Sequence, residues 1–576
     1  MSQGRLYTAL PILLAGLLFT SSNLLKPLVI DDATYHAYAE QVSRSPGDPY
    51  GFEILWQDIL QPAIDVVVPP VLPYWWGAVI AVVGERPLLW KLSLLPFALL
   101  LSWALFELMR RFARGFELPL TWMVLFSPVL LPAFNLMLDV PSLALSLASV
   151  ALLLRACDED RVAPAIWAGL AAGLAMQTKY NAVVPVVAAL SWAVLAGRMK
   201  QVTTAGGLAA LVFVGWESFT SWRYGDSGFL LGLTTVERWQ EWPASDWLLA
   251  LLSILGAVAP ALLLLGQLAL GRSRRTLGLL AAGCALPFAS LPLLESLRAS
   301  GWLAQRGIDY PMPEQALFAV VGIGVIGTTL QIARRRLREI EPGLASRIGA
   351  TLRDRSALDA DQRATLILLL WVALEVAGYF AIAPFFASRR VIGIYVASTL
   401  LTAHFLSRTA VAAAAMPAVK TIAAGGALLA VVFAVSDHLD ARSHLAALAA
   451  AERRIEENDP AARDTTTWFV HRWGFGFEAG RRGMRRLVAD ESRLERGDWL
   501  LVPSHSVPPR VKFVRGGLTR IDRIGAPSPW PWSTLPSAYA GPLPIRGRQA
   551  TPFGITIYRV RRDFVPLGRA EGAGGT

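Results

Sequence analysis

The chain is poor in cysteine and in charged residues. Its 576 residues include only two cysteines, Cys157 and Cys284, which lie far apart in or beside apolar runs. A disulfide framework and a cysteine metal site are therefore excluded. Charged residues make up 17% of the chain, against about 25% in soluble domains. This scarcity of charge argues against a soluble globular protein.

Several catalytic signatures are also missing. The sequence has no phosphate-binding P-loop, no dinucleotide fingerprint, no His-Glu-x-x-His pair and no Gly-x-Ser-x-Gly elbow. An energy-coupled pump and a zinc protease are therefore unsupported.

The chain is instead rich in long runs of apolar residues. Hydrophobic residues reach 54%, the mean hydropathy is +0.45, and a spanning helix needs about 20 apolar residues. We predict a mainly α polytopic membrane protein with about thirteen transmembrane helices. The candidate runs are 7–29, 88–109, 118–134, 139–155, 164–178, 180–197, 203–222, 247–269, 276–296, 314–333, 364–383, 391–407 and 417–436.

The short run 71–84 is rich in proline and aromatic residues, and charge decides how it is interpreted. If it does not span, the basic clusters fall on the cytoplasmic side, as the positive-inside rule requires. The same rule accounts for the net charge of +11 without nucleic acid. The clusters are Arg110, Arg111 and Arg114; Arg155 and Arg161; Arg198 and Lys200; Arg272, Arg274 and Arg275; and the stretch from Arg334 to Arg363. We therefore predict an interfacial helix at 71–84.

This topology divides the chain into two parts. Residues 1–436 form the transmembrane module, with a first external loop over 30–87. Residues 437–576 hold no further span and carry strand-like runs such as 498–502 and 555–560. We predict a small external α/β domain there, with the last dozen residues as a disordered tail.

Charged residues at the external ends of the predicted spans are the candidate site. Asp31 and Asp32 follow the first span, and Asp139 opens the fourth. Lys179 lies in the turn between 164–178 and 180–197, and Arg389 with Arg390 opens the run 391–407. Charge at the membrane border is costly and usually functional. We predict one polar cavity whose cations hold a phosphate and whose acids act as base or metal ligands.

Each of these residues also has a structural interpretation. Asp139 could cap a helix that carries Pro141 in its first turn, and Lys179 could reach toward lipid headgroups. His36 could be a loop residue. Arg389 and Arg390 run against the positive-inside trend, so topology alone does not explain them.

The whole set of motifs resembles the GT-C glycosyltransferases, in particular the family-39-like relatives of protein O-mannosyltransferases and lipid A aminoarabinose transferases. Asp31-Asp32-Ala33-Thr34-Tyr35 resembles the family's Asp-Glu-x-x-Tyr. The run from Pro69 to Trp75 resembles its His-Pro-Pro-Leu-x-Tyr-Trp. The other matching pieces are Leu138-Asp139-Val140-Pro141, the run from Gly173 to Tyr180, and Arg390-Val391-Ile392.

The resemblance implies transfer of a sugar from a polyprenyl phosphate to a protein, lipid or glycan acceptor, with inversion at the anomeric carbon of the sugar. It implies that the transfer takes place at the outer face of the bacterial inner membrane. It implies that Asp31 is the catalytic base and that Asp32 assists it. Asp139, Tyr35 and His36 would bind substrate, and Lys179, Arg389 and Arg390 would hold the lipid phosphate.

Two positions depart from the family pattern. Val68 stands where its histidine would be, and Asp32 stands where glutamate is usual. The cofactor therefore stays open: Asp32 and Asp139 could hold a divalent cation, but the sequence does not require one.

Two other functions compete with transfer. A transporter or flippase of a lipid-linked or anionic substrate should carry charge near mid-membrane and show repeats or broken helices. A non-catalytic lipid-binding scaffold would need the cations but not the acid pair. The clustering of charge at one face favours a glycosyltransferase.

The predicted topology can be tested directly. A reporter fused after residue 440 should be active only outside the cytoplasm, because thirteen spans place the two termini on opposite sides. A cytoplasmic signal from this fusion would put the proposed acids and cations on the wrong faces.

Overall fold

The protein is described from a computed structural model that covers residues 3–568, except 57–58, 240–241, 341–357, 460–464, 471–472, 505–510, 529 and 549–552. Most of the predicted disordered tail lies outside these described residues. So does the middle of the basic stretch from Arg334 to Arg363.

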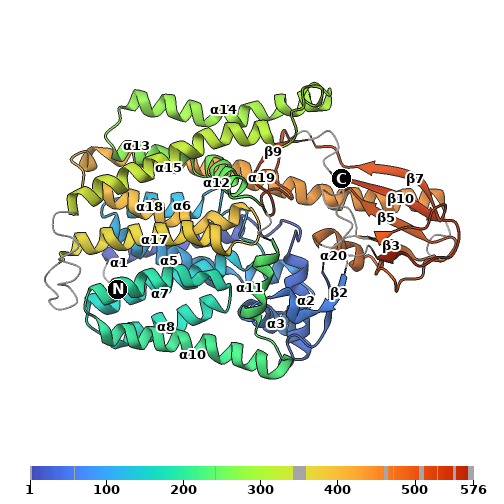
Figure 1. Cartoon of the computed structure of the whole chain (residues 1–576), viewed down its shortest axis with the longest axis horizontal. Helices are drawn as coiled ribbons and strands as arrows, with labels where there is room; N and C mark the ends of the chain where they lie inside the picture. Colours follow the sequence, from blue (N-terminus) through green and yellow to red (C-terminus); the bar gives the residue numbers. More distant parts are fainter. Residues whose placement is uncertain are drawn as a thin grey trace.

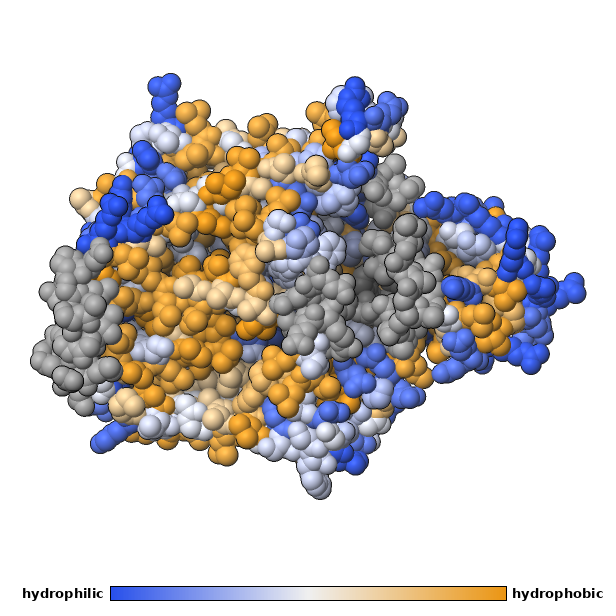
Figure 2. All heavy atoms as spheres, in the orientation of Figure 1, coloured by the Kyte–Doolittle hydropathy of each residue, from blue (hydrophilic) through white to orange (hydrophobic). Residues whose placement is uncertain are grey.

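A bundle of helices forms most of the molecule, and a small domain containing strands lies at one end of it (Figure 1). Apolar side chains cover the flank of the bundle, and hydrophilic ones gather on the small domain (Figure 2). This distribution suits a protein surrounded by lipid along the bundle. The predicted polytopic helical fold with a small C-terminal domain is confirmed.

Most helices of the bundle coincide with the apolar runs of the sequence, whereas α11 lies between two of them. The helices of the bundle are α1 (Gln3–Ser21), α4 (Pro87–Leu92), α5 (Leu95–Phe112), α6 (Glu117–Leu125), α7 (Asp139–Asp158), α8 (Val162–Met176), α9 (Val183–Leu195), α10 (Met199–Tyr224), α11 (Gly228–Trp239), α12 (Ala244–Val258), α13 (Pro260–Ala269), α14 (Arg274–Ala299), α15 (Met312–Ile340), α17 (Ala360–Ile382), α18 (Ile392–Leu406) and α19 (Ala412–Asn458).

The number of thirteen spans is not confirmed. Seven helices among the described residues are long and apolar enough to cross a membrane, or eight if the bent pair α12 and α13 is one span. Four further apolar helices are shorter, with 10–17 residues.

Three of the predicted runs are broken. Run 118–134 is helical only to Leu125, because Pro128 and Pro132 follow and cannot donate to a helical ladder. The first run ends as a helix at Ser21, so residues 22–31 form turns and extended chain ahead of the next helix. Run 247–269 bends by 80° between α12 and α13, where Pro260 begins the second helix.

The segment that follows α1 folds into short helices and one pair of strands. It contains α2 (Asp32–Arg44), the antiparallel strands β1 (Glu53–Trp56) and β2 (Ile59–Pro62), the 3-10 helix η1 (Ala63–Val66) and α3 (Val71–Val83). Helix α3 has 13 residues and is thus about 20 Å long, which is shorter than the roughly 30 Å hydrocarbon core. Its length is consistent with the predicted interfacial position.

The C-terminal domain is attached through α19, a 47-residue helix that runs from the bundle to the sheet (Figure 1). The sheet has five strands in the order β4-β3-β5-β10-β7. Their bounds are β3 (Thr467–Phe469), β4 (Arg485–Arg486), β5 (Trp499–Pro503), β7 (Leu518–Gly525) and β10 (Gly554–Val560). Strands β3 and β5 are parallel, while β10 is antiparallel to both β5 and β7. Helix α20 (Trp473–Arg481) and the short strands β6 (Val511–Lys512) and β11 (Leu567–Gly568) complete the domain.

One part of the C-terminal sequence does not stay in that domain. Residues 530–548, here called the return segment, carry the short paired strands β8 (Trp532–Ser533) and β9 (Arg546–Gly547). Leu535, Tyr539 and Ile545 are buried in the same hydrophobic cluster as the bundle helices. The boundary at residue 437 therefore does not separate two independent packing units.

Charged residues mark the end of the bundle away from the site. Arg111 pairs with Asp158 and Arg198 with Asp160. Asp361 contacts His404, Arg336 and Arg408. These pairs tie together the ends of α5, α7, α15, α17 and α18, as expected if the basic clusters share one face.

Close packing of α12 against α15 depends on two glycines. A Cβ at Gly256 would lie 1.8 Å from the Phe318 carbonyl oxygen, and a Cβ at Gly322 would lie 1.9 Å from the Leu252 carbonyl oxygen. Both obstacles are backbone atoms, so no side chain can move aside.

We expect Gly322→Val to lower the melting temperature or the yield of folded protein sharply, because overpacking typically costs about 1–3 kcal/mol and backbone contact costs more. Gly327→Val is the control, because Gly327 lies on the same helix and a Cβ added there has open space around it. Thermal unfolding in detergent measures both. Equal stability of the two variants would contradict the described packing.

Candidate functional site

A cavity of about 1130 Å³ lies where the end of the bundle meets the return segment. Six of the eight predicted site residues line it, namely Asp31, Tyr35, Asp139, Lys179, Arg389 and Arg390. The sequence separates these residues by up to 359 positions, so the fold alone brings them together.

Asp31 is held by a tight turn before α2. Ile30 has φ +45°, a left-handed conformation that is strained for a β-branched residue. The Asp32 carboxylate stabilises this turn by accepting a hydrogen bond from the Val29 N–H at 2.8 Å. As a result, Asp31 faces the cavity while Asp32 points into the protein.

Asp139 and Lys179 form an ion pair across α7 and the turn after α8. Asp139 is the first residue of α7, and Leu138 occupies the N-cap position. Asp139 therefore lies in the first turn of the helix, one residue after the cap, with its carboxylate on Lys179. The Lys179 turn is fixed in place by the Val71 N–H, which donates to the Gln177 carbonyl at 3.1 Å.

Arg389 connects the two carboxylates. Its Nη2 lies 3.0 Å from Asp31 Oδ2, and its Nη1 lies 3.8 Å from Asp139 Oδ2. Both arginines belong to η4 (Ser388–Val391), the 3-10 helix that precedes α18. Arg389 is thus shared between an acid from the first loop and an acid from α7.

Arg390 forms no ion pair within the ranges that the structure describes, and its Nε has no hydrogen-bond partner. Its guanidinium lies 4.9 Å from the centroid of the Phe385 ring. The buried charged cluster at one side of the cavity, formed by Asp31, Asp139, Lys179, Arg389 and Arg390, therefore holds three cations and two carboxylates, which leaves one cation without a counter-ion in the cluster. Asp246, Asp309 and Glu375 line other parts of the cavity. A buried charge without a counter-ion is costly, so an anion beside Arg390 would lower that cost.

Burial and neighbouring charges shift the pKa values of these three cations. Burial, together with Arg389, lowers the pKa of Arg390 to about 10. Burial also lowers the pKa of Lys179 to about 8, although Asp139 opposes that shift. Burial disfavours the charge of Arg389 as well, but Asp31 and Asp139 together hold its pKa above the usual value. An anion would favour the charged form of all three.

Tyr35 lies one helical turn after Asp31 and lines the same cavity. Its ring centroid is 6.4 Å from that of Trp76 on α3, and burial raises the pKa of its hydroxyl. The hydroxyl is therefore neutral and able to donate.

Asp32 and His36 do not line this cavity, so their predicted contact with substrate stays a prediction. Asp32 is 0% exposed and also accepts a hydrogen bond from Asn135. Burial raises its pKa to about 7. His36 lies between the rings of Trp90 and Phe477, at 4.5 and 5.2 Å, and burial lowers its pKa to about 4. His36 thus packs from α2 against α4 and α20, and its Nε2 lies 3.3 Å from Glu85 Oε2.

Asp32 and Asp139, which we predicted as possible ligands of a divalent cation, contact different partners. The oxygens of Asp139 face Lys179 and Arg389, and Asp32 Oδ2 is occupied by two donors. Among the described residues, no group of three or more His, Cys, Asp or Glu side chains could share an ion.

Several residues of this region were not found by sequence reasoning. Lys26 was counted as part of the first apolar run, yet it forms a buried ion pair with Asp437 at 2.6 Å. Pro536, Ala540, Gly541 and Pro542 of the return segment line the cavity. A lysine inside an apolar run was the one available signal.

Comparison with known proteins supports the resemblance. Residues 67–222 match the model of the dolichyl-phosphate-mannose-protein mannosyltransferase family. This segment contains the proline-aromatic motif, Asp139 and Lys179, and it leaves out Asp31 and Arg389. The match confirms the resemblance to family-39-like GT-C enzymes and indicates a membrane glycosyltransferase rather than a transporter. No curated protein matches the chain.

Among solved structures, the chain is similar to ArnT from Cupriavidus metallidurans, whose crystal structure holds undecaprenyl phosphate. The identity is 13%, the TM-score is 0.35, and the match covers 87% of this chain and 93% of that one.

Because burial lowers the pKa of Lys179 to about 8, anion affinity of the cavity should depend on pH. The protonated lysine binds the anion, so affinity should be full well below pH 8 and fall by up to about tenfold per pH unit above it. Binding of a short polyprenyl phosphate between pH 7 and 9.5 measures this. Lys179→Arg should remove the decline, because arginine stays charged over that range. An identical decline in both proteins would exclude Lys179 as its cause.

Proposed function

We propose that this protein is a glycosyltransferase that takes a sugar from a polyprenyl phosphate and passes it to a hydroxyl group of a protein, lipid or glycan. One observation carries the proposal: the buried cluster of Asp31, Asp139, Lys179, Arg389 and Arg390 at the cavity holds one cation more than its two carboxylates neutralise, next to a carboxylate that can accept a proton. A phosphate supplies the missing negative charge, and the acid beside it serves the acceptor.

The phosphate of the donor binds at Arg390, Arg389 and Lys179. Arginine offers a planar fork of donors that matches phosphate oxygens. The free Nε atoms of Arg389 and Arg390 give each guanidinium a donor that is not already used. The apolar residues Val184, Leu249 and Ile382 also line the cavity, and they suit the start of a polyprenyl chain.

Asp31 is the base. Its Oδ2 accepts from Arg389 at 3.0 Å, and its Oδ1 accepts no hydrogen bond from the described part of the chain. The acceptor hydroxyl donates to Oδ1 and transfers its proton there as its oxygen attacks the anomeric carbon. General bases placed in this way contribute about 10²- to 10⁴-fold in rate.

The reaction forms one bond and breaks one bond at the anomeric carbon of the sugar. The new bond joins that carbon to the acceptor oxygen, and the bond to the phosphate oxygen breaks with inversion. The electron pair leaves on the polyprenyl phosphate, whose added charge the three cations stabilise. Arg389 contacts both Asp31 and the departing phosphate, so it can offset the loss of negative charge when Asp31 becomes protonated.

The other acids act by position. Asp139 orients Lys179 and Arg389, and Asp32 keeps Asp31 in place through the strained turn at Ile30. Tyr35 donates its hydroxyl hydrogen bond to substrate. We place the cavity and the C-terminal domain on the outer face of the inner membrane, in accord with the charge topology, with residues 1–436 as the catalytic module.

The decisive variant is Asp31→Asn. It should lower sugar transfer by about 10²- to 10⁴-fold while polyprenyl phosphate binds as tightly as before or more tightly, because Arg389 loses a competing carboxylate. Transfer to a mixed acceptor preparation and binding of the lipid phosphate measure the two effects separately.

Asp65→Asn is the matched control, since Asp65 is an exposed acid of η1 in the same region. It should leave both transfer and binding unchanged. Full transfer by Asp31→Asn would rule out Asp31 as the base. A wild-type protein that binds no polyprenyl phosphate would overturn the proposed donor.

A further inference from the structure

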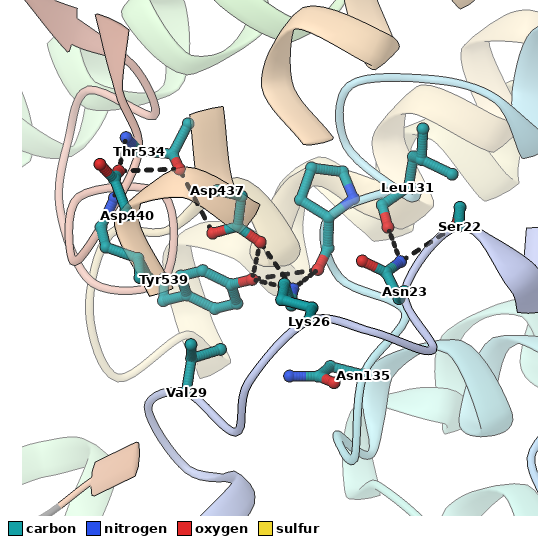
Figure 3. A network of polar contacts seen from close by, with 12 residues as sticks. Ser22, Asn23, Lys26, Val29, Leu131, Asn135, Asp437, Asp440, Thr534 and Tyr539 are labelled. Carbon is teal, nitrogen blue, oxygen red and sulfur yellow. Dashed lines mark hydrogen bonds and ion pairs between the residues drawn. The ribbon is translucent and has the colours of Figure 1, made fainter. Parts of the chain in front are cut away.

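A second polar network lies behind the cavity and connects the C-terminal domain to it. Asp437 and Asp440 project from α19, one helical turn apart, toward the return segment (Figure 3). Both carboxylates are buried. Neither belongs to the cavity, so the proposed reaction does not account for them.

Asp440 holds the start of the return segment. Its Oδ2 accepts hydrogen bonds from Ser533 Oγ at 2.9 Å, the Thr534 N–H at 2.7 Å and the Leu535 N–H at 3.0 Å. Its Oδ1 pairs with Arg548 Nη2 at 2.6 Å. Because β8 and β9 are also paired, one carboxylate fixes both ends of the segment.

Asp437 holds the middle of the segment. The Tyr539 hydroxyl donates to Asp437 Oδ2 at 2.8 Å, and Lys26 Nζ lies 2.6 Å from the same oxygen (Figure 3). Lys26 also donates to the Pro132 carbonyl at 3.1 Å. The network thus joins α19, the chain after α1 and the turns after α6 through buried charges, where losing one partner is expensive.

The other side of the return segment contacts the chain that carries the two arginines. The Ser388 N–H and Oγ both donate to the Ala538 carbonyl, at 3.1 and 2.7 Å. The Gly541 N–H donates to the Phe386 carbonyl at 2.8 Å. These bonds are made immediately before Arg389, and they come from residues that flank Tyr539 in the return segment.

The same stretch forms part of the cavity wall through Pro536, Ala540, Gly541 and Pro542. Its residues therefore sit on the cavity while their anchors lie on α19. A segment used only to attach the domain would not need bonds to the backbone of η4 and its approach.

We propose that the return segment is a positioning element for the phosphate-binding arginines, with Tyr539 and Asp440 as its positioning residues. The inference rests on the proposed phosphate site and deepens it. The C-terminal domain sets the affinity for the donor phosphate, through a chain of contacts that runs from Asp437 and Tyr539 to Ala538, Ser388 and Arg389.

The principal test is Tyr539→Phe, which removes one oxygen atom from the network. Its matched control is Tyr38→Phe, since Tyr38 is equally buried and donates to the Ala63 carbonyl at 2.6 Å, away from the return segment. A second pair is Ser388→Ala with Ser149→Ala, because Ser149 is a buried serine that donates to the Ala168 carbonyl at 2.8 Å.

Two readouts separate positioning from general stability. We expect Tyr539→Phe and Ser388→Ala to bind a short polyprenyl phosphate about three- to thirtyfold more weakly. A loss of this size is typical when a residue influences a binding site without touching the ligand. Amide hydrogen exchange in peptides covering 384–391 should become faster, whereas exchange in α7 and α8 should not change. The KM for the donor should rise while the KM for the acceptor stays the same.

Unchanged phosphate binding and unchanged exchange at 384–391 in both variants would overturn the inference. Equal effects in the variants and their controls would also overturn it, because they would reflect loss of any buried hydroxyl. Wild-type binding of polyprenyl phosphate is measured first, without transfer. Its absence would refute the proposed function and this inference together, whereas normal wild-type binding with unaffected variants would refute this inference alone.

Discussion

Arg389 lies between two buried carboxylates that belong to distant parts of the chain, and the geometry of the site depends on this arrangement. One carboxylate, Asp31, sits 3.0 Å away on the turn before α2, and the other, Asp139, begins α7. Each would be costly to bury without a counter-ion. The shared arginine therefore fixes the relative positions of the first loop, α7 and η4, and it leaves Arg390 as the cation without a carboxylate.

Asp31 and Asp32 are adjacent in sequence, but their carboxylates have different hydrogen-bond partners. Asp31 has one oxygen on Arg389 and one toward the cavity, whereas Asp32 has one oxygen on the Val29 N–H and Asn135. Two adjacent acids thus face opposite directions. Asp31 borders the cavity, and Asp32 supports the strained backbone at Ile30.

The return segment changes how the C-terminal domain is understood. Its sheet packs around its own core, but residues 530–548 are buried in the bundle. Asp437, Lys26 and Tyr539 connect the two regions behind the cavity (Figure 3). The length of α19 makes this possible, since one helix carries the membrane-spanning run and the two acids that anchor the segment.

Composition and pattern alone determined the class of the protein and the order of its helices. Apolar length fixes where helices form, because backbone groups in lipid must bond within their own segment. The charged residues at helix ends were likewise visible, since charge in an apolar sequence stands out. Helix ends at Ser21 and Leu125 were misjudged because hydropathy does not register turns that are buried inside the protein.

Only the tertiary structure decided which charges meet. Lys179, Asp139 and Arg389 could be assigned to one face, but their pairing depends on how α7, α8 and η4 pack. The inward direction of Asp32, the packing role of His36 and the entry of residues 536–542 into the cavity wall left no trace in the sequence pattern. Hydropathy records the depth of a residue in the membrane, whereas the direction of a side chain is set by neighbours far away along the chain.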